Sequence, residues 1–270
     1  MRLVDTHCHL DADEFDADRD EVVRRAEAAG VAAQIVPAIA RSGFAKLRAI
    51  CAANPQLHAA YGLHPLLLAE HRPPHLDELA AWLERERPVA VGECGLDYFV
   101  DGLDRDAQHA YFARQLELAR ELELPVVVHA RRAVEDVVAA IRRVGGLHGV
   151  VHSFSGSPEQ ARQLWKLGFL IGLGGPVTYA RAHRLRRLVA TMPLEFLLLE
   201  TDAPDQPTAT HRGERNEPAR VREVLAAIAA LRGEPEAEIA AATSANARRL
   251  FGLDAAAAAA GAAPPPRARP

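Results

Sequence analysis

Short apolar segments alternate with longer segments of helical period along most of this chain, and this alternation restricts the fold more than any other feature. It is typical of repeated βα units, which build a parallel sheet covered by helices. Eight such pairs can be counted, and 270 residues suit their closure into one barrel. We therefore predict the α/β class and a single (β/α)8 TIM barrel. The expected strands are Leu3 to His7, Ala33 to Pro37, Leu57 to Gly62, Val89 to Glu93, Val126 to His129, Gly149 to His152, Phe169 to Gly172 and Phe196 to Thr201.

Some of the intervening helices are clearly marked in the sequence. Residues 107–122 carry an apolar stripe at helical spacing, and residues 158–167 follow Ser157, a residue type common at helix N-caps. Two further helices, at 218–231 and 235–250, are expected to complete the outer layer of the barrel after the eighth strand.

Composition limits the classes of protein that this chain can belong to. Residues 1–254 form the predicted barrel domain, and residues 255–270, mostly alanine, glycine and proline, form a low-complexity tail expected to be disordered. The net charge of −4 gives no general attraction to a polyanion, so bound cations and local arginines would have to attract nucleic-acid phosphates. No leader pattern and no membrane-length apolar run is visible, and the three cysteines form no CxxC pair. We expect a soluble cytoplasmic protein without a membrane contact or an obligate protein partner.

Six residues of metal-ligand type directly follow or end the predicted strands. The carboxyl ends of barrel strands open onto one face, so residues far apart in the sequence become neighbours there. Desolvating four imidazoles and two carboxylates together is costly unless they share a cation. The sequence therefore predicts a metal site. Its predicted ligands are His7, His9, Glu93, His129, His152 and Asp202.

The spacing of His7, Cys8 and His9 suits two ligands on one extended segment. Strand side chains alternate between faces, so both imidazoles point to one side and Cys8 points away. The same alternation turns Cys94 away from Glu93. We expect both sulfurs to be buried packing groups and not ligands.

The ligand set favours two divalent ions over one. Six ligands exceed the need of a single tetrahedral ion with an open position, but they suit two ions that share a carboxylate. Glu93 is the natural bridge. A modified bridging lysine is excluded, because the only lysines, Lys46 and Lys166, fall in predicted helices. Such ions activate water for hydrolysis, and Asp202 can serve as both ligand and general base. The imidazole-rich shell favours Zn²⁺, Mn²⁺ or Ni²⁺ over Mg²⁺.

Several further residues lie near the predicted site, and two of them are candidates for substrate binding. His64 ends the third strand and Arg131 follows the fifth, where either can bind a phosphate oxygen; loop packing and a surface ion pair are the structural alternatives. Asn216 is expected to cap a helix, and Tyr98 and Phe154 to be packing aromatics. We assign no site role to the remaining histidines, which are His58, His71, His75, His109, His148, His183 and His211.

The motifs around these residues occur in barrel order. They are Asp5-Thr6-His7-Cys8-His9, Tyr61-Gly62-Leu63-His64-Pro65, Gly92 to Tyr98, Pro125 to His129, His152-Ser153-Phe154-Ser155-Gly156 and Glu200-Thr201-Asp202-Ala203-Pro204. With these motifs, from residue 3 to the 246–253 segment, the sequence resembles the TatD-type metal-dependent hydrolases, a family of deoxyribonucleases with amidohydrolase-like barrels.

The resemblance implies one metal held by His7, His9 and Asp202. It implies a second metal held by His129 and His152, with Glu93 in contact with both. It also implies phosphodiester cleavage from the 3′ end of single-stranded DNA, with Mg²⁺ as the usual assay metal.

Substrate choice is less closely defined than the metal site. Ala130 stands where the family often has serine, and Asp205-Gln206-Pro207 stand where it often has a hydrophobic residue and a proline. The first hypothesis is a 3′-5′ exonuclease that acts on short single strands of nucleic acid. The alternative is a metallo-hydrolase of a carboxylic ester, lactone, amide or aminoacyl-tRNA, which would use the same activated water. A binding module with a vestigial site ranks last, because no ligand is missing.

Overall fold

All eight predicted strands are present in the computed structural model, which describes residues 1–254. They pair in parallel and in sequence order, and the backbone N–H of Thr6 donates to the carbonyl of Leu199 at 2.9 Å to join the two ends of the sheet. The TIM barrel is therefore confirmed, whereas the predicted tail at 255–270 lies outside the described residues. The strands are β1 (Leu3–Asp5), β2 (Val31–Ala38), β3 (Leu57–Tyr61), β4 (Ala90–Asp97), β5 (Val126–Arg131), β6 (Gly149–Val151), β7 (Phe169–Leu173) and β8 (Leu197–Leu199).

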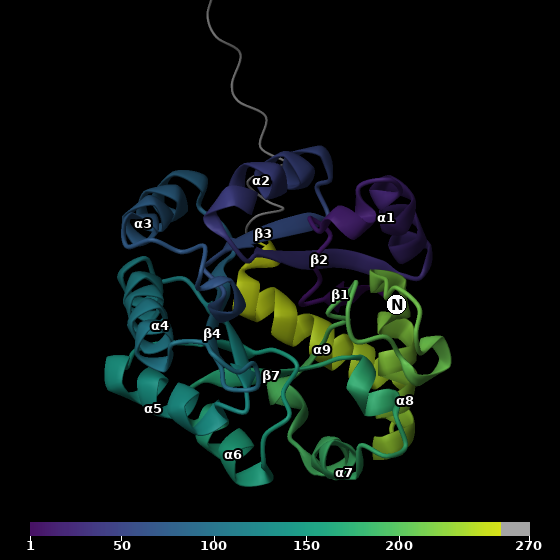
Figure 1. Cartoon of the computed structure of the whole chain (residues 1–270). Coiled ribbons are helices and arrows are strands. Elements are labelled where there is room, and N and C mark those ends of the chain that lie inside the picture. The colour runs from purple at the N-terminus through teal and green to yellow at the C-terminus, as the bar shows by residue number, and fades with distance from the viewer. Residues whose placement is uncertain (255–270) are drawn as a thin grey trace, which may run out of the picture.

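Helices link the strands and surround them (Figure 1). The predicted Ser157 cap is confirmed, since its hydroxyl accepts from the N–H of Gln160, whose side chain accepts in return from the N–H of Ser157. No helix in residues 1–254 combines the length and hydropathy needed to cross a membrane. The α-helices are α1 (Arg19–Ala28), α2 (Phe44–Ala53), α3 (Pro74–Glu86), α4 (Arg105–Glu121), α5 (Val134–Val144), α6 (Pro158–Lys166), α7 (His183–Thr191), α8 (Val221–Arg232) and α9 (Glu236–Phe251). Short 3-10 helices are η1 (Asp13–Phe15), η2 (Arg41–Gly43), η3 (Pro65–Leu67), η4 (Gly175–Thr178), η5 (Leu194–Phe196), η6 (Ala209–His211) and η7 (Pro218–Arg220).

The last helix does not join the outer layer, contrary to the sequence prediction. In Figure 1, α9 crosses the centre of the barrel, while α8 lies in the surrounding ring. The side chain of Ser244 donates to the carbonyl of Arg2, and that of Asn246 donates to the carbonyl of Leu197, so α9 lies at the amino ends of the strands. It closes that end by packing apolar side chains against those that fill the barrel. This shared core contains Val4, Ile35, Ala60, Ala90, Val127, Val150, Leu170, Leu198, Ala247, Leu250, Phe251 and Leu253.

Two glycines allow β4 to approach β5 closely where it carries Glu93. Gly92 and Gly95 have φ angles of +141° and +151°, values that side chains disfavour. A Cβ at Gly95 would lie 2.0 Å from the carbonyl oxygen of His129. The glycines therefore let Glu93 lie beside a histidine of the neighbouring strand.

Candidate metal centre

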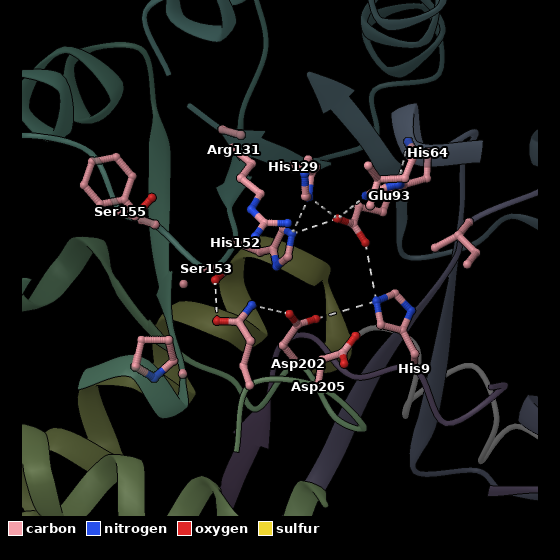
Figure 2. A pocket seen from close by; sticks show the side chains of 18 of the residues that line it. His9, His64, Glu93, His129, Arg131, His152, Ser153, Ser155, Asp202 and Asp205 are labelled. Carbon is pink, nitrogen blue, oxygen red and sulfur yellow. Dashed lines mark hydrogen bonds and ion pairs between the residues drawn. The ribbon is translucent and has the colours of Figure 1, made fainter. Parts of the chain in front are cut away.

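The six predicted ligands come together at the carboxyl ends of the strands. Five of them line a cavity of about 830 Å³ at this end of the barrel (Figure 2). The sixth, His7, is completely buried, and its ring stacks on that of His152 with centroids 3.8 Å apart. The barrel therefore places these side chains as the strand-end argument expects.

Glu93 lies between two groups of histidines and presents one carboxylate oxygen to each. Its Oε2 is 3.1 Å from Nε2 of His7 and 3.5 Å from Nε2 of His9. Its Oε1 is 2.7 Å from Nε2 of His152 and 3.0 Å from Nδ1 of His129. This is the arrangement expected of a carboxylate shared by two cations.

The first group consists of His7, His9 and Asp202. The two Nε2 atoms are 3.2 Å apart, and Oδ1 of Asp202 lies 3.5 Å and 3.6 Å from them. Nδ1 of His9 is 3.2 Å from the carbonyl oxygen of Pro37, which accepts its proton and leaves the Nε2 lone pair directed into the site. Two imidazole lone pairs that converge at this distance repel each other unless a proton or a cation lies between them. The donor set therefore fits a divalent cation.

The second group consists of His129 and His152, with Nδ1 of the first 3.3 Å from Nε2 of the second. On its other side, His129 points Nε2 at Oδ2 of Asp97, 2.9 Å away. A carboxylate in this position takes the Nε2 proton and directs the Nδ1 lone pair toward the site. Asp97 received no role from the sequence, although it ends the same strand that carries Glu93.

His64 also contacts the carboxylate of Glu93. Its Nε2 is 3.0 Å from Oε1 of Glu93, and its Nδ1 accepts from the backbone N–H of Leu66 at 3.1 Å. Because Nδ1 is an acceptor, Nε2 carries the proton of the neutral ring and donates it to Glu93. Burial favours this neutral form by lowering the pKa of His64 to about 4. Both ring nitrogens therefore have protein partners, and phosphate binding by His64 stays a prediction.

Burial and neighbouring charges shift the pKa values of Glu93, His152 and His7. Burial opposes the charged form of Glu93, but the surrounding imidazoles, His152 foremost, hold its pKa well below the ordinary value. Burial likewise opposes the charged form of His152, but the negative charge of Glu93 raises the pKa of that imidazole to about 10. Burial and the charge of His152 lower the pKa of His7 well below its usual value. The carboxylates thus create a strong local preference for positive charge.

Two buried carboxylates behind the ligands were missed in the sequence. Oε1 of Glu200 accepts from the N–H of Ser153 at 2.5 Å, and burial raises the pKa of Glu200 to about 8. Asp5 accepts from the hydroxyl of Thr201 at 2.6 Å, and burial raises its pKa to about 7. Each holds the loop beside a predicted ligand. In the sequence both belong to the motifs that carry the resemblance, two residues before His7 and Asp202, but they received no role there.

The structure corrects one of the remaining sequence predictions, the helix cap at Asn216. Asn216 does not cap the helical turn at 218–220; its side-chain amide donates to the carbonyls of Thr201 and Asp205 and fixes the loop after β8. Phe154 is buried, as expected of a packing aromatic, and Tyr98 donates its hydroxyl to Asp136 at 2.6 Å. Cys8 and Cys94 are buried and absent from the ligand groups found in residues 1–254.

Several known proteins are similar to this chain over most of its length. The family model described as "TatD related DNase" matches residues 4–252. The uncharacterized metal-dependent hydrolase YjjV of Escherichia coli K12 is 42% identical over 255 residues, which cover 93% of this chain and 98% of YjjV. Its crystal structure superposes with a TM-score of 0.89 at 41% identity, over 93% of this chain and 98% of that one. A relative from Klebsiella pneumoniae, named 3'-5' ssDNA/RNA exonuclease TatD, is 34% identical over 263 residues, which cover 93% of this chain and 98% of that protein.

Proposed function

Because this chain belongs to the TatD-related family of metal-dependent hydrolases, we propose that it uses two divalent ions to cleave phosphodiester bonds from the 3′ end of short single-stranded nucleic acids. The relative from Klebsiella that is named for this activity supports the proposal. The observation that carries it is the position of Glu93, whose two oxygens face separate groups of nitrogen ligands.

The metal assignment follows from these contacts. His7, His9 and Asp202 would hold one ion, His129 and His152 the other, and Glu93 both. Two such cations would supply water activation and would stabilise the charge on the entering and leaving oxygens of an in-line phosphoryl displacement. Zn²⁺, Mn²⁺ or Ni²⁺ suits this imidazole-rich set better than Mg²⁺.

Three side chains would contribute proton transfer, positioning of Glu93 and phosphate binding. Asp202 is the proposed general base, because its carboxylate lies at the cavity wall, with Oδ1 3.5 Å from Nε2 of His7, where it can accept a proton from the attacking water. His64 holds Glu93 in place through its Nε2 proton. Arg131 lines the same cavity and is exposed, where its guanidinium group can bind a phosphate oxygen of the substrate.

The cavity and charge favour the end of a single strand over a duplex. A volume of about 830 Å³ accommodates a nucleotide-sized group. The net charge of −4 gives no general attraction to a long polyanion, so local contacts must provide the affinity.

The direct test is nucleotide release from single strands with different ends, measured with metal-loaded protein. We expect mononucleotides to be released from a strand with a free 3′ end and a blocked 5′ end, and no release when only the 3′ end is blocked. Release should fall steeply with added salt, because phosphate contacts contribute to binding. Cleavage at internal positions of a strand blocked at both ends would contradict the exonuclease assignment.

A further inference from the structure

Exposed apolar side chains gather beside the cavity mouth. Of the large hydrophobic residues exposed in residues 1–254, only Met1 lies elsewhere. The others follow β2, β3 and β4, and two of them line the cavity. They are Ile39, Leu66, Phe99 and Val100. Single exposed apolar residues are ordinary, so exposure alone assigns no ligand contact to any of these side chains. Only a member with further partners suited to a ligand is a candidate.

Phe99 is the aromatic member of this group and lies against two consecutive arginines. Its side chain is 44% exposed. The guanidinium carbon of Arg131 lies 3.6 Å from the centre of its ring, and that of Arg132 lies 4.7 Å away. Neither arginine forms an ion pair within the described part of the chain. Their charge is therefore available to an anion.

These arginines connect the metal centre with a second cavity. In Figure 2, Arg131 lies beside His129 and His152. Arg132 lines a neighbouring cavity of about 300 Å³, and the two cavities share Ser155 in their walls. The sugar-phosphate backbone of a strand bound at the metal centre would therefore pass first the guanidinium group of Arg131 and then that of Arg132.

A fixed turn presents Phe99. Oδ1 of Asp97 accepts from the backbone N–H groups of Phe99 at 2.8 Å and Val100 at 3.1 Å. Oδ2 of the same carboxylate holds His129. One side chain thus fixes a metal-facing imidazole and the exposed ring, and a ring held in advance loses little entropy when it binds a ligand.

We infer that Phe99, Arg131 and Arg132 form a nucleotide subsite next to the metals, where a base stacks on the part of the phenyl ring that the two guanidinium groups leave exposed, and these groups bind the adjoining phosphates. The inference rests on the proposed function. Every base has a π-face, so this subsite accepts any sequence. It also selects single strands, because bases stacked inside a duplex do not expose their faces.

Two single strands of equal length separate the contribution of base stacking to binding from that of the phosphate charges. One strand carries normal bases, and the other carries abasic residues at the same phosphates. Phe99→Ala is expected to raise KM roughly 5- to 100-fold on the normal strand, the range set by stacking on one aromatic ring, and to leave KM on the abasic strand unchanged. Phe99→Trp should restore binding of the normal strand. Arg132→Ala should raise KM on both strands alike, because the phosphates are still present.

Val100→Ala is the matched control, since Val100 is a similarly exposed neighbour on the same turn. It should leave KM unchanged on both strands, and thermal unfolding should show that every variant is folded. Two results would overturn the subsite. One is an equal KM for wild type and Phe99→Ala on the normal strand, and the other is an equal rise in KM on both strands. Either result leaves the proposed function intact as long as the wild type still releases nucleotides. If the wild type releases nucleotides from neither strand, the proposed function fails and the subsite fails with it.

Discussion

The double replacement of His7 and His9 by alanine is expected to reduce hydrolysis below detection and to remove at least one metal ion per chain. Both Nε2 atoms face Asp202 and Oε2 of Glu93, so the double variant lacks every nitrogen ligand of the first group. Turnover and elemental analysis on the same preparation measure both effects. Circular dichroism should remain native, because the packing that closes the barrel lies below this site.

Cys8→Ala is the control for that double variant. Cys8 lies between the two histidines but points into the core, where its sulfur is 3.8 Å from the carbonyl oxygen of Ile35. The control should change stability at most and keep the full metal content. A double variant with wild-type activity would refute the metal assignment, and metal loss in Cys8→Ala would refute the strand register.

Asp202→Asn is expected to lower kcat by about 10²- to 10⁴-fold, the contribution typical of a general base. The amide keeps the shape and one oxygen ligand but cannot accept a proton from water. The backbone should not change, because residue 202 has a φ of +57°, a conformation that both aspartate and asparagine tolerate. Steady-state kinetics with added metal and a metal count on the same sample are the required measurements.

The neighbouring carboxylate Asp205 provides a comparison for Asp202. Asp205 lines the same cavity, yet it forms no side-chain contact with the histidines of the centre within residues 1–254. Asp205→Asn should retain near wild-type turnover. If Asp202→Asn binds both metals and also retains near wild-type turnover, the base lies elsewhere.

The barrel was predictable because each strand is short, apolar and followed by a helical segment, as in Val126 to His129 before α5. The position of α9 was not, because an amphipathic helix packs equally well on the outside of a barrel or across its end. Asn246 of α9 donates to the carbonyl of Leu197, and this contact helps to hold the helix across the end of the barrel. No pattern in the sequence predicts that these two residues meet.

The clustering of the six proposed ligands was predictable for a related reason, since strand ends converge and strand side chains alternate. The groups that support the ligands depend on loop geometry, which periodicity does not encode. Asp97 reaches His129 only because β4 extends beyond Glu93, and Glu200 has room only because Gly172 lacks a Cβ, which would lie 2.0 Å from its Oε2. Phe99 was missed for the same reason, as its exposure depends on the turn after Asp97.

The most direct test of the central claim is a parallel assay of one preparation against a single-stranded oligonucleotide and a panel of carboxylic esters, lactones, amides and aminoacyl-tRNA, under identical metal conditions. The barrel and its metal centre are compatible with attack on phosphorus or on a carbonyl carbon, so only turnover separates the two chemistries. We predict nucleotide release from the oligonucleotide, strongest with Mn²⁺, Zn²⁺ or Ni²⁺, and little turnover of the carbonyl substrates. No nucleotide release with any divalent metal, together with rapid turnover of an ester or aminoacyl-tRNA, would contradict the nuclease assignment and leave the metal centre in place.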